Sequence, residues 1–111
     1  MKVLSRSTLR AFWERDEGKA AKQPLLSWFK EAEKAQWRSP ADVRRLYRSA
    51  DVIGGDRVVF NIGGNKYRLV VWVKYSLGLV LIKWVGTHSD YDAIDVTTIG
   101  LPKKLKARSR S

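Results

Sequence analysis

The fold of this chain is decided by residues 57–92, which read RVVFNIGGNKYRLVVWVKYSLGLVLIKWVGTHSDYD. Two runs of alternating apolar residues flank Gly64 and Asn65, a pair favoured in two-residue hairpin loops because glycine tolerates the positive φ that such turns need. Counting outward from this loop predicts three facing pairs: Ile62 with Tyr67, Phe60 with Leu69, and Val58 with Val71. One side of the hairpin is therefore wholly apolar and suited to face a core.

The other side of the same hairpin carries a mixture of polar, cationic and aromatic side chains. Its members are Asn61, Lys66, Arg68, Val70, Trp72 and Lys74. A surface that only packs against apolar elements does not need cations, whereas amide and cationic side chains are the ones that contact phosphate groups. This side of the hairpin predicts contact with nucleic acid.

Composition narrows the class of protein. The chain has 111 residues, of which 44% are hydrophobic and 11% aromatic, and this is enough for one folded domain with a modest core. Lys and Arg number 22 against 11 acidic residues, which gives a net charge of +11. A charge of this size is typical of a protein with a polyanionic partner, and the plainer alternative is a merely soluble basic protein.

Several other classes are disfavoured by what the sequence lacks. No stretch approaches the roughly 18 apolar residues of a membrane span. The N-terminus also lacks the apolar region of a secretion signal, so we expect a cytoplasmic protein without a membrane partner. The sequence has no cysteine, which excludes disulfides, thiolate nucleophiles and cysteine-based zinc sites.

The N-terminal half predicts a short strand over residues 1–5 followed by helices. Ser7 is placed to cap a first helix, whose pattern closes at Gly18. Pro24 suits the first turn of a second helix. Apolar residues that would pack on the sheet recur at helical spacing in both segments: Leu9, Phe12 and Trp13 in the first, and Leu25, Trp28, Phe29 and Ala32 in the second.

A third, shorter helix is predicted to start with Ser39 as its cap and Pro40 at its first position, with Asp42 returning a hydrogen bond to the cap. One more short turn is expected over residues 89–94, before a basic tail over residues 102–111. The order β-α-α-α-β-β-β predicts a single α+β domain over residues 1–101. Its small antiparallel meander sheet would carry two to three N-terminal helices packed on one face.

Two segments of the sequence resemble those of a known family. FNIGGNKYRL at residues 60–69 and GTHSDYD at residues 86–92 combine an Asn-x-Gly-Gly-Asn turn, an arginine three residues later and a Thr-His-x-x-Tyr-Asp ending. In this order they resemble the HigB family of bacterial toxin endoribonucleases, which have the small RelE-like toxin fold. The N-terminal half is similar to the family mainly in length and helical character.

The resemblance implies an activity and partners. Toxins of this kind belong to type II toxin-antitoxin systems and cleave mRNA, usually on the translating ribosome. We therefore expect mRNA and the ribosome as partners. A cognate helix-turn-helix antitoxin of the HigA kind, encoded beside the toxin, would inhibit it.

The residues available limit the chemistry. His88 is the sole histidine, which excludes a ribonuclease mechanism with two histidines and a zinc site built on several. Asp90 and Asp92 form the only close carboxylate pair near the hairpins, and two residues in a turn more often cap or contact solvent than bind magnesium. RNA carries its own nucleophile, the 2′-hydroxyl, so cleavage needs only a proton acceptor, cations and a donor for the leaving 5′-oxygen. We expect a metal-independent reaction without a cofactor.

Carried over residue by residue, the resemblance implies four catalytic residues. Arg68 would clamp the scissile phosphate, with a surface ion pair as the plainer reading. Lys83 would be a second clamp or a base, provided that the loop around residues 76–78 has four residues, because a three-residue loop turns Lys83 to the other face. His88 would act as general acid or base, against the common alternative of a bond to a backbone carbonyl. Tyr91 would stack on a base or donate a proton.

Four further residues are expected to bind RNA without taking part in the chemistry: Asn61, Lys66, Lys74 and Trp72. For Trp72, as for Trp84, stacking on a base and burial under a helix or the tail both remain open. A different class of function also remains open, a non-catalytic basic RNA-binding or ribosome-associated module. A DNA-binding regulator is less favoured, because no recognition-helix pattern stands out.

Overall fold

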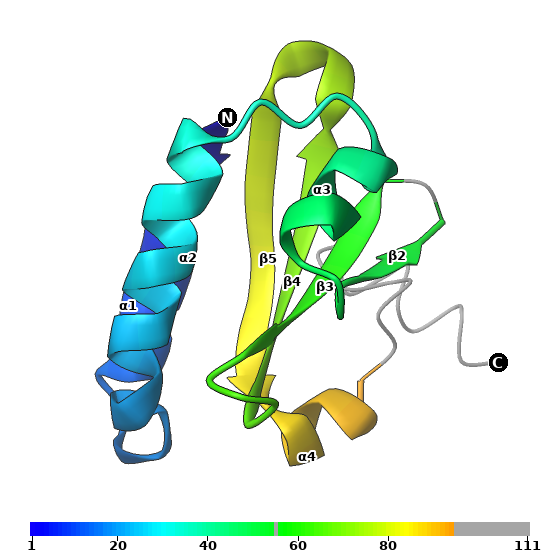
Figure 1. Ribbon diagram of the computed structural model, residues 1–111. Helices are drawn as coiled ribbons and strands as arrows, with labels where there is room; N and C mark the ends of the chain where they lie inside the picture. Colours follow the sequence, from blue (N-terminus) through cyan, green and yellow to red (C-terminus); the bar gives the residue numbers. More distant parts are fainter. Residues whose placement is uncertain (55, 95–111) are drawn as a thin grey trace, which may run out of the picture.

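The computed structural model describes residues 1–54 and 56–94 and shows a five-stranded sheet with helices packed on it (Figure 1). The strand order is β1-β5-β4-β3-β2. The strands are β1 Lys2–Leu4, β2 Asp51–Ile53, β3 Arg57–Ile62, β4 Tyr67–Lys74 and β5 Leu79–Thr87. β1 lies parallel to β5, and the other neighbouring strands are antiparallel. The α+β class is as predicted, and the sheet is mixed where a pure meander is expected from the sequence.

Three helices cover one face of the sheet: α1 Arg6–Trp13, α2 Lys22–Lys34 and α3 Pro40–Leu46. α1 and α2 lie side by side at the β1–β5 edge, and α3 lies further along, on the side of β3 and β4 (Figure 1). Two 3-10 segments, η1 Asp16–Ala21 and η2 Tyr75–Leu77, connect α1 to α2 and β4 to β5. A fourth helix, α4 His88–Asp92, follows β5 directly, close to the turn predicted there.

The core lies between these helices and the sheet. α2 turns Leu25, Trp28 and Ala32 inward, and the Trp28 ring meets the Phe60 ring of β3 edge-on, with ring centres 5.4 Å apart. Trp28 is 1% exposed and Trp13 is 8% exposed, so both tryptophans are core residues, as predicted. Burying one large apolar side chain in this way stabilises the fold by about 2–3 kcal/mol relative to leaving it in water.

The β3–β4 hairpin has the predicted register. All three expected pairs are present: Ile62 with Tyr67, Phe60 with Leu69, and Val58 with Val71. Gly64 and Asn65 have φ values of 62° and 85°, the positive pair that a type I′ turn requires. The Lys66 N–H donates to the Gly63 carbonyl at 3.4 Å and closes the turn.

The β4–β5 hairpin has the loop length that places Lys83 on the same face as Arg68. Lys74 pairs with Leu79, so residues 75–78 form a four-residue connection. Further along, the register shifts, because Val71 pairs with Ile82 while Val70 pairs with Trp84. Lys83 is the extra residue of this β-bulge.

Two local predictions for the first helix are wrong. α1 begins two residues earlier than expected, so Ser7 lies inside it and Ser5 is the N-cap, with φ of 72° and no side-chain hydrogen bond. Gly18 lies within η1, beyond the end of α1, and does not close the helix. A Cβ at this position would lie 2.1 Å from the Phe12 carbonyl oxygen, so glycine serves the close approach of two backbone segments.

The start of α3 is predicted in part. Ser39 is the N-cap and Pro40 is the first helical residue, as expected. The Asp42 carboxylate, however, accepts a hydrogen bond from the Arg38 N–H at 2.9 Å, and not from the cap residue. Because the backbone is extended at Ser39, with φ of −157°, the N–H that reaches the Asp42 carboxylate is that of the preceding residue, Arg38.

The sheet edges differ most from prediction. The predicted order contains no strand at the position of β2. The N-terminal strand β1 was predicted, but it pairs in parallel with β5 and so makes the sheet mixed. Each of these strands has only three residues, too few to show an alternating pattern. The predicted boundary at residue 101 and the basic tail over residues 102–111 lie outside the described residues. Among residues 1–54 and 56–94, no helix has the length and apolar character needed to cross a membrane.

Candidate functional site

The face of the sheet opposite α1, α2 and α3 carries the polar side chains of the hairpins. We call it the open face, and its members are Arg57, Asn61, Arg68, Trp72, Lys74, Lys83 and Trp84. Only Val59 and Val70 are fully buried on it, under a small cover formed by Ile53, Trp84, Tyr91 and Ile94. α4 therefore closes part of the open face, and polar side chains lie on both sides of this cover.

The first group of polar side chains lies where β4 meets α4. The Arg68 guanidinium carbon is 6.0 Å from the centre of the Tyr91 ring. The guanidinium also donates to the backbone carbonyls of Asn65 and Tyr67, at 3.2 and 3.3 Å. It forms no ion pair within the described residues. Arg68 is thus held in place by neutral carbonyls and keeps its charge free for an anion.

His88 is tied to the same place through the backbone. Its N–H donates to the Lys66 carbonyl at 3.1 Å, which fixes the first residue of α4 to the β3–β4 turn. Its imidazole Nε2 lies 3.5 Å from the Asp92 carboxylate, and the side chain is 49% exposed. Thr87 caps α4 by accepting the Asp90 N–H at 3.1 Å. The side chain of His88 is therefore available to a ligand and oriented by a carboxylate.

Tyr91 lies one turn along α4 from His88. Its ring packs against Trp84, with centres 6.2 Å apart. Burial, and then the nearby Asp51 carboxylate, raise the pKa of Tyr91 above its ordinary value of 10.0, while the Arg68 charge lowers it. The net effect keeps the phenol protonated at neutral pH, which suits a proton donor better than a proton acceptor.

The second group of polar side chains surrounds Trp72, on the far side of the cover. Three cations lie within 5.4 Å of the centre of its rings: Lys83 at 4.3 Å, Arg57 at 4.7 Å and Lys74 at 5.4 Å. We call this set the Trp72 cluster. A base could stack on Trp72 only after one of these cations moves, so the indole serves in this arrangement to hold cations.

Asp56 neutralises part of the Trp72 cluster. Its carboxylate lies 2.9 Å from the Lys74 ammonium and 3.2 Å from the Arg57 guanidinium. The hydrogen bond from Lys74 is the main reason that the pKa of Asp56 is lowered, and the Arg57 charge adds to it. In the described part of the chain, Lys83 has no carboxylate partner. Lys83 is therefore the member of the cluster whose charge is available to an anion.

The structure thus divides the predicted catalytic residues. Arg68 lies against Tyr91 at one end of the open face, and His88 begins the helix that carries Tyr91, while Lys83 lies with Trp72. Arg68 and Trp72 are four residues apart on β4, a separation of about 13 Å along a strand. This spacing of the two backbone positions suits successive contacts along an extended polyanion.

The four predicted RNA-binding residues also divide between the two groups. Asn61 pairs with Arg68 across the hairpin, and its amide Nδ2 lies 3.5 Å from the Ser49 carbonyl. Lys66 is exposed in the turn beside Arg68. Lys74 and Trp72 belong to the Trp72 cluster.

Sequence reasoning missed Asp56 and Arg57. Extending the hairpin register by one more pair places Arg57 opposite Trp72, and this signal could have identified it. Asp56 precedes the strand and has no periodic pattern, so its role depends on the fold alone.

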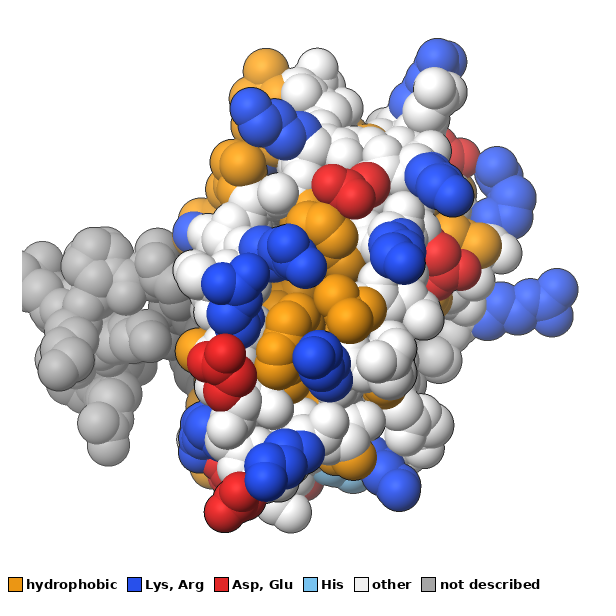
Figure 2. Space-filling view, turned by 90° about the vertical axis from the view of Figure 1, so that its left-hand side faces the viewer, with side chains coloured by type: hydrophobic (Ala, Val, Ile, Leu, Met, Phe, Trp, Pro, Cys, Tyr) orange, Lys and Arg blue, Asp and Glu red, His pale blue; other side chains and the backbone are white. Residues whose placement is uncertain are grey.

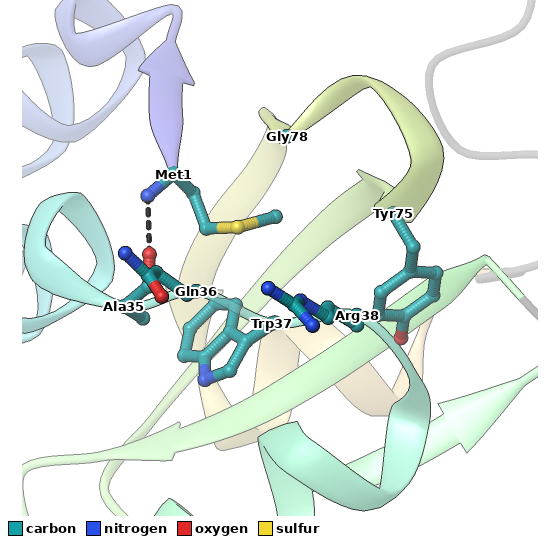
Figure 3. Close-up of a pocket in the computed structure, with 7 residues that line it drawn as sticks. All are labelled: Met1, Ala35, Gln36, Trp37, Arg38, Tyr75 and Gly78. Carbon is teal, nitrogen blue, oxygen red and sulfur yellow. Dashed lines mark hydrogen bonds between the residues drawn. The ribbon is translucent and has the colours of Figure 1, made fainter.

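A pocket of about 320 Å³ lies elsewhere, between the α2–α3 connection and the β4–β5 connection (Figure 3). Its lining consists of Met1, Ala35, Gln36, Trp37, Arg38, Tyr75 and Gly78. The Met1 ammonium donates to the Ala35 carbonyl at 2.6 Å, beside the end of α2. None of the predicted site residues lines this pocket, so the open face remains the candidate site.

Acidic and histidine side chains do not gather on the open face. Within residues 1–54 and 56–94, no three His, Cys, Asp or Glu side chains are close enough to hold a metal ion together. The chemistry of the described site is that of cations, one imidazole and one phenol.

Comparison with known families identifies the chain. The family model of the HigB toxin, described as the RelE-like toxic component of a toxin-antitoxin system, matches residues 21–94. The chain belongs to the HigB toxin family. The match extends from α2 to α4 and therefore includes every residue of the open face. A search among curated proteins gave no match.

Membership of the HigB family confirms the resemblance seen in residues 60–69 and 86–92, and extends it to α2 and α3. The mixed sheet with its helices is consistent with the RelE-like fold of that family. The chain is thus the toxic component of a toxin-antitoxin system, for which an antitoxin is the natural partner.

Proposed function

We propose that this toxin is a metal-independent endoribonuclease that cleaves mRNA, on the translating ribosome, by attack of the RNA 2′-hydroxyl. The observation that carries the proposal is the contact of Arg68 with Tyr91 at the end of the open face, with His88 one turn before Tyr91 on α4. A guanidinium without an ion-pair partner, an exposed imidazole and a protonated phenol are together sufficient for this reaction.

The reaction divides among these three side chains. The 2′-oxygen bonds to the adjacent phosphorus as the bond from phosphorus to the 5′-oxygen breaks, leaving a 2′,3′-cyclic phosphate and a 5′-hydroxyl. His88 accepts the proton of the 2′-hydroxyl, and Tyr91 donates a proton to the leaving 5′-oxygen. Arg68 binds the scissile phosphate through two parallel N–H bonds and neutralises the charge that develops on it.

The remaining open-face residues bind the RNA on either side of the scissile phosphate. Lys66 and Asn61 contact the strand beside Arg68. Lys83 binds a phosphate further along, held against the Trp72 indole with Lys74 beside it. Each phosphate neutralised on a single strand makes the logarithm of affinity fall more steeply with the logarithm of salt concentration, by about 0.7.

The biological setting follows from the toxin-antitoxin family. The toxin acts in the cytoplasm, where mRNA and ribosomes are available, and arrests growth by cleaving translated messages. A cognate helix-turn-helix antitoxin of the HigA kind inhibits it until it is needed.

The test is inducible expression in a bacterial host, with mapping of new 5′ ends on cellular mRNA. Wild type should arrest growth and produce cuts with a three-nucleotide period in translated frames. Arg68→Ala should lower cleavage by about 10²-fold or more, because it removes the main stabiliser of the phosphate charge. Its fold should persist, since Arg68 is not a core residue and its bonds are to carbonyls at the surface. Normal growth with soluble, folded wild-type protein would favour a non-catalytic RNA-binding module.

A further inference from the structure

A second surface of the molecule is built differently from the open face. On the outward side of α1 and α2, apolar side chains are exposed in the middle, with many Lys and Arg side chains and fewer Asp and Glu side chains around them (Figure 2). We call this surface the helix-pair patch. Its apolar residues are Leu26 and Phe29, and the largely buried ring of Trp13 lies at its end, beside Lys22. Leu26 and Phe29 are partly buried against the edge of the core, on a side of α2 next to the buried residues Leu25 and Trp28.

The cations of the helix-pair patch contact its aromatic rings. The Arg6 guanidinium carbon lies 5.3 Å from the centre of the Phe29 ring, and the Lys22 ammonium lies 6.0 Å from the centre of the Trp13 rings. Arg10 follows Arg6 by one turn of α1, and the sequence of α1 contains no acidic residue. The side of the patch that α1 forms is therefore basic.

These cations also lack partners within the molecule. In the part of the chain that the structure describes, none of Arg6, Arg10 and Lys22 forms an ion pair. The neighbouring connection between α1 and α2 differs, because its cations are neutralised by its own carboxylates: Arg15 by Glu17, and Lys19 by Asp16. Glu31 of α2 is turned away to accept a hydrogen bond from Tyr47. The charges of Arg6, Arg10 and Lys22 are thus available to carboxylates of another molecule.

We propose that the helix-pair patch binds an acidic amphipathic segment of the cognate antitoxin. Apolar side chains of that segment pack on Leu26 and Phe29, and its carboxylates pair with Arg6, Arg10 and Lys22, in the manner of a helix laid along a groove. The inference rests on the proposed inhibition by an antitoxin. It adds the place of binding, which lies on the helical side of the sheet, opposite the open face.

Charge complementarity selects this occupant over others. A second copy of the chain would bring the same cations against the rim, and like charges across an interface are repulsive. Residues 102–111 carry only cations among their charged residues, so they are repelled as well. RNA would place phosphates near Glu33, which follows Phe29 by one turn on the same side of α2, and it would gain little from an apolar centre.

The test compares two variants of equal charge. The rim variant, Arg6→Glu/Lys22→Glu, reverses the charge at two positions of the patch. The control variant, Arg44→Glu/Arg48→Glu, reverses the charge at one exposed position in α3 and one just after it. Each variant lowers the net charge from +11 to +7. Glutamate has nearly the same helix propensity as the residues it replaces, and all four positions are exposed, so both variants should fold. The probe is the purified protein encoded beside the toxin gene, titrated by calorimetry.

We expect the rim variant to bind that protein at least tenfold more weakly, and the control variant to change by less than about threefold. In co-expression, the rim variant should remain toxic in the presence of the antitoxin. Equal weakening in both variants, or none in either, would overturn the proposal, as would a rim variant that loses RNA affinity and keeps antitoxin affinity. Because binding is measured directly, a toxin that proved not to cleave RNA would still give a clear answer.

Discussion

Asp56→Asn should make this toxin bind RNA more tightly, although it removes a hydrogen-bonded carboxylate. Asp56 is the only acidic side chain in contact with the Trp72 cluster among the described residues, and it neutralises Lys74 and Arg57 at 2.9 and 3.2 Å. Asparagine has nearly the same shape and can still accept a hydrogen bond. The substitution therefore frees two cations and changes little else.

The magnitude follows from Coulomb's law. A phosphate bound by the cluster would lie roughly 6 Å from the Asp56 carboxylate, and in a water-like medium the repulsion at that distance is about 0.7 kcal/mol. Removing it raises affinity about threefold at low salt. Two further cations become available to phosphate, so the slope of log affinity against log salt should steepen by up to about 1.4.

The assay is fluorescence anisotropy of a labelled single-stranded RNA whose 2′-hydroxyls are methylated, so that binding is measured without cleavage. Affinity is recorded from low to high salt for wild type, Asp56→Asn and Asp16→Asn. Asp16 is a matched control because its side chain is 99% exposed and pairs with Lys19 in η1, away from the open face. The same charge change there should raise affinity by less than a factor of about 1.5.

Equal gains in the two variants would show that only net charge matters and would refute the role of the Trp72 cluster. A loss of affinity in folded Asp56→Asn would show that Asp56 positions its cations for RNA.

The same variant makes a prediction about stability and pH. The pKa of Asp56 is lowered from 3.8 in the folded state, so its contribution to stability is fully present above that value and is lost as pH falls through the lowered pKa. Since the carboxylate is 35% exposed, the contribution should be no more than about 1 kcal/mol. Denaturant unfolding should therefore separate wild type from Asp56→Asn at pH 7, and the two should converge as the pH falls below 3.8 and through the lowered pKa.

Three further substitutions test other parts of the site. Tyr91→Phe keeps the ring against Trp84 and removes the proton donor, so cleavage should fall by about 10²-fold with unchanged RNA affinity; full activity in a single-turnover assay would indicate that Tyr91 only stacks. Gly86→Ala would place a Cβ 2.6 Å from the Trp84 indole, and denaturant unfolding should show a loss of about 1–3 kcal/mol; an unchanged midpoint would mean that Trp84 moves freely. Lys83→Met should lower RNA affinity at all sequences alike and reduce the salt slope by about 0.7, while cleavage of saturating RNA stays normal; a slower cleavage step instead would place Lys83 at the reacting phosphate.

Most of the candidate site could be predicted because it belongs to one hairpin. Alternation over β3 and β4, together with the Gly64–Asn65 turn, fixes which side chains share a face, so Arg68 and Trp72 could be placed opposite the core. The position of Lys83 depended on a loop length that the sequence left open, and the structure gives the four-residue connection. The bulge there adds a residue that no alternation rule supplies.

Contacts between distant segments could not be predicted in this way. The bond from the His88 N–H to the Lys66 carbonyl, the approach of Arg68 to Tyr91, and the capture of Lys74 by Asp56 all join residues with no common periodicity. The short first strand was predicted and is present as β1, but its parallel pairing with β5 was not predicted, and β2 was missed because three residues carry too little pattern.

The sequence by itself determined the hairpin register, the buried faces of α1 and α2, the basic charge and the family, because each depends on local residue spacing or on composition. Only the tertiary structure decided that Arg68 lies against Tyr91 while three other cations surround Trp72, and that Asp56 neutralises two of those three. It also decided that cations with no ion-pair partner among the described residues lie beside apolar side chains of α1 and α2. These features depend on which distant side chains the packed core brings within a few ångströms, and electrostatic and hydrogen-bonding energies change steeply over such distances.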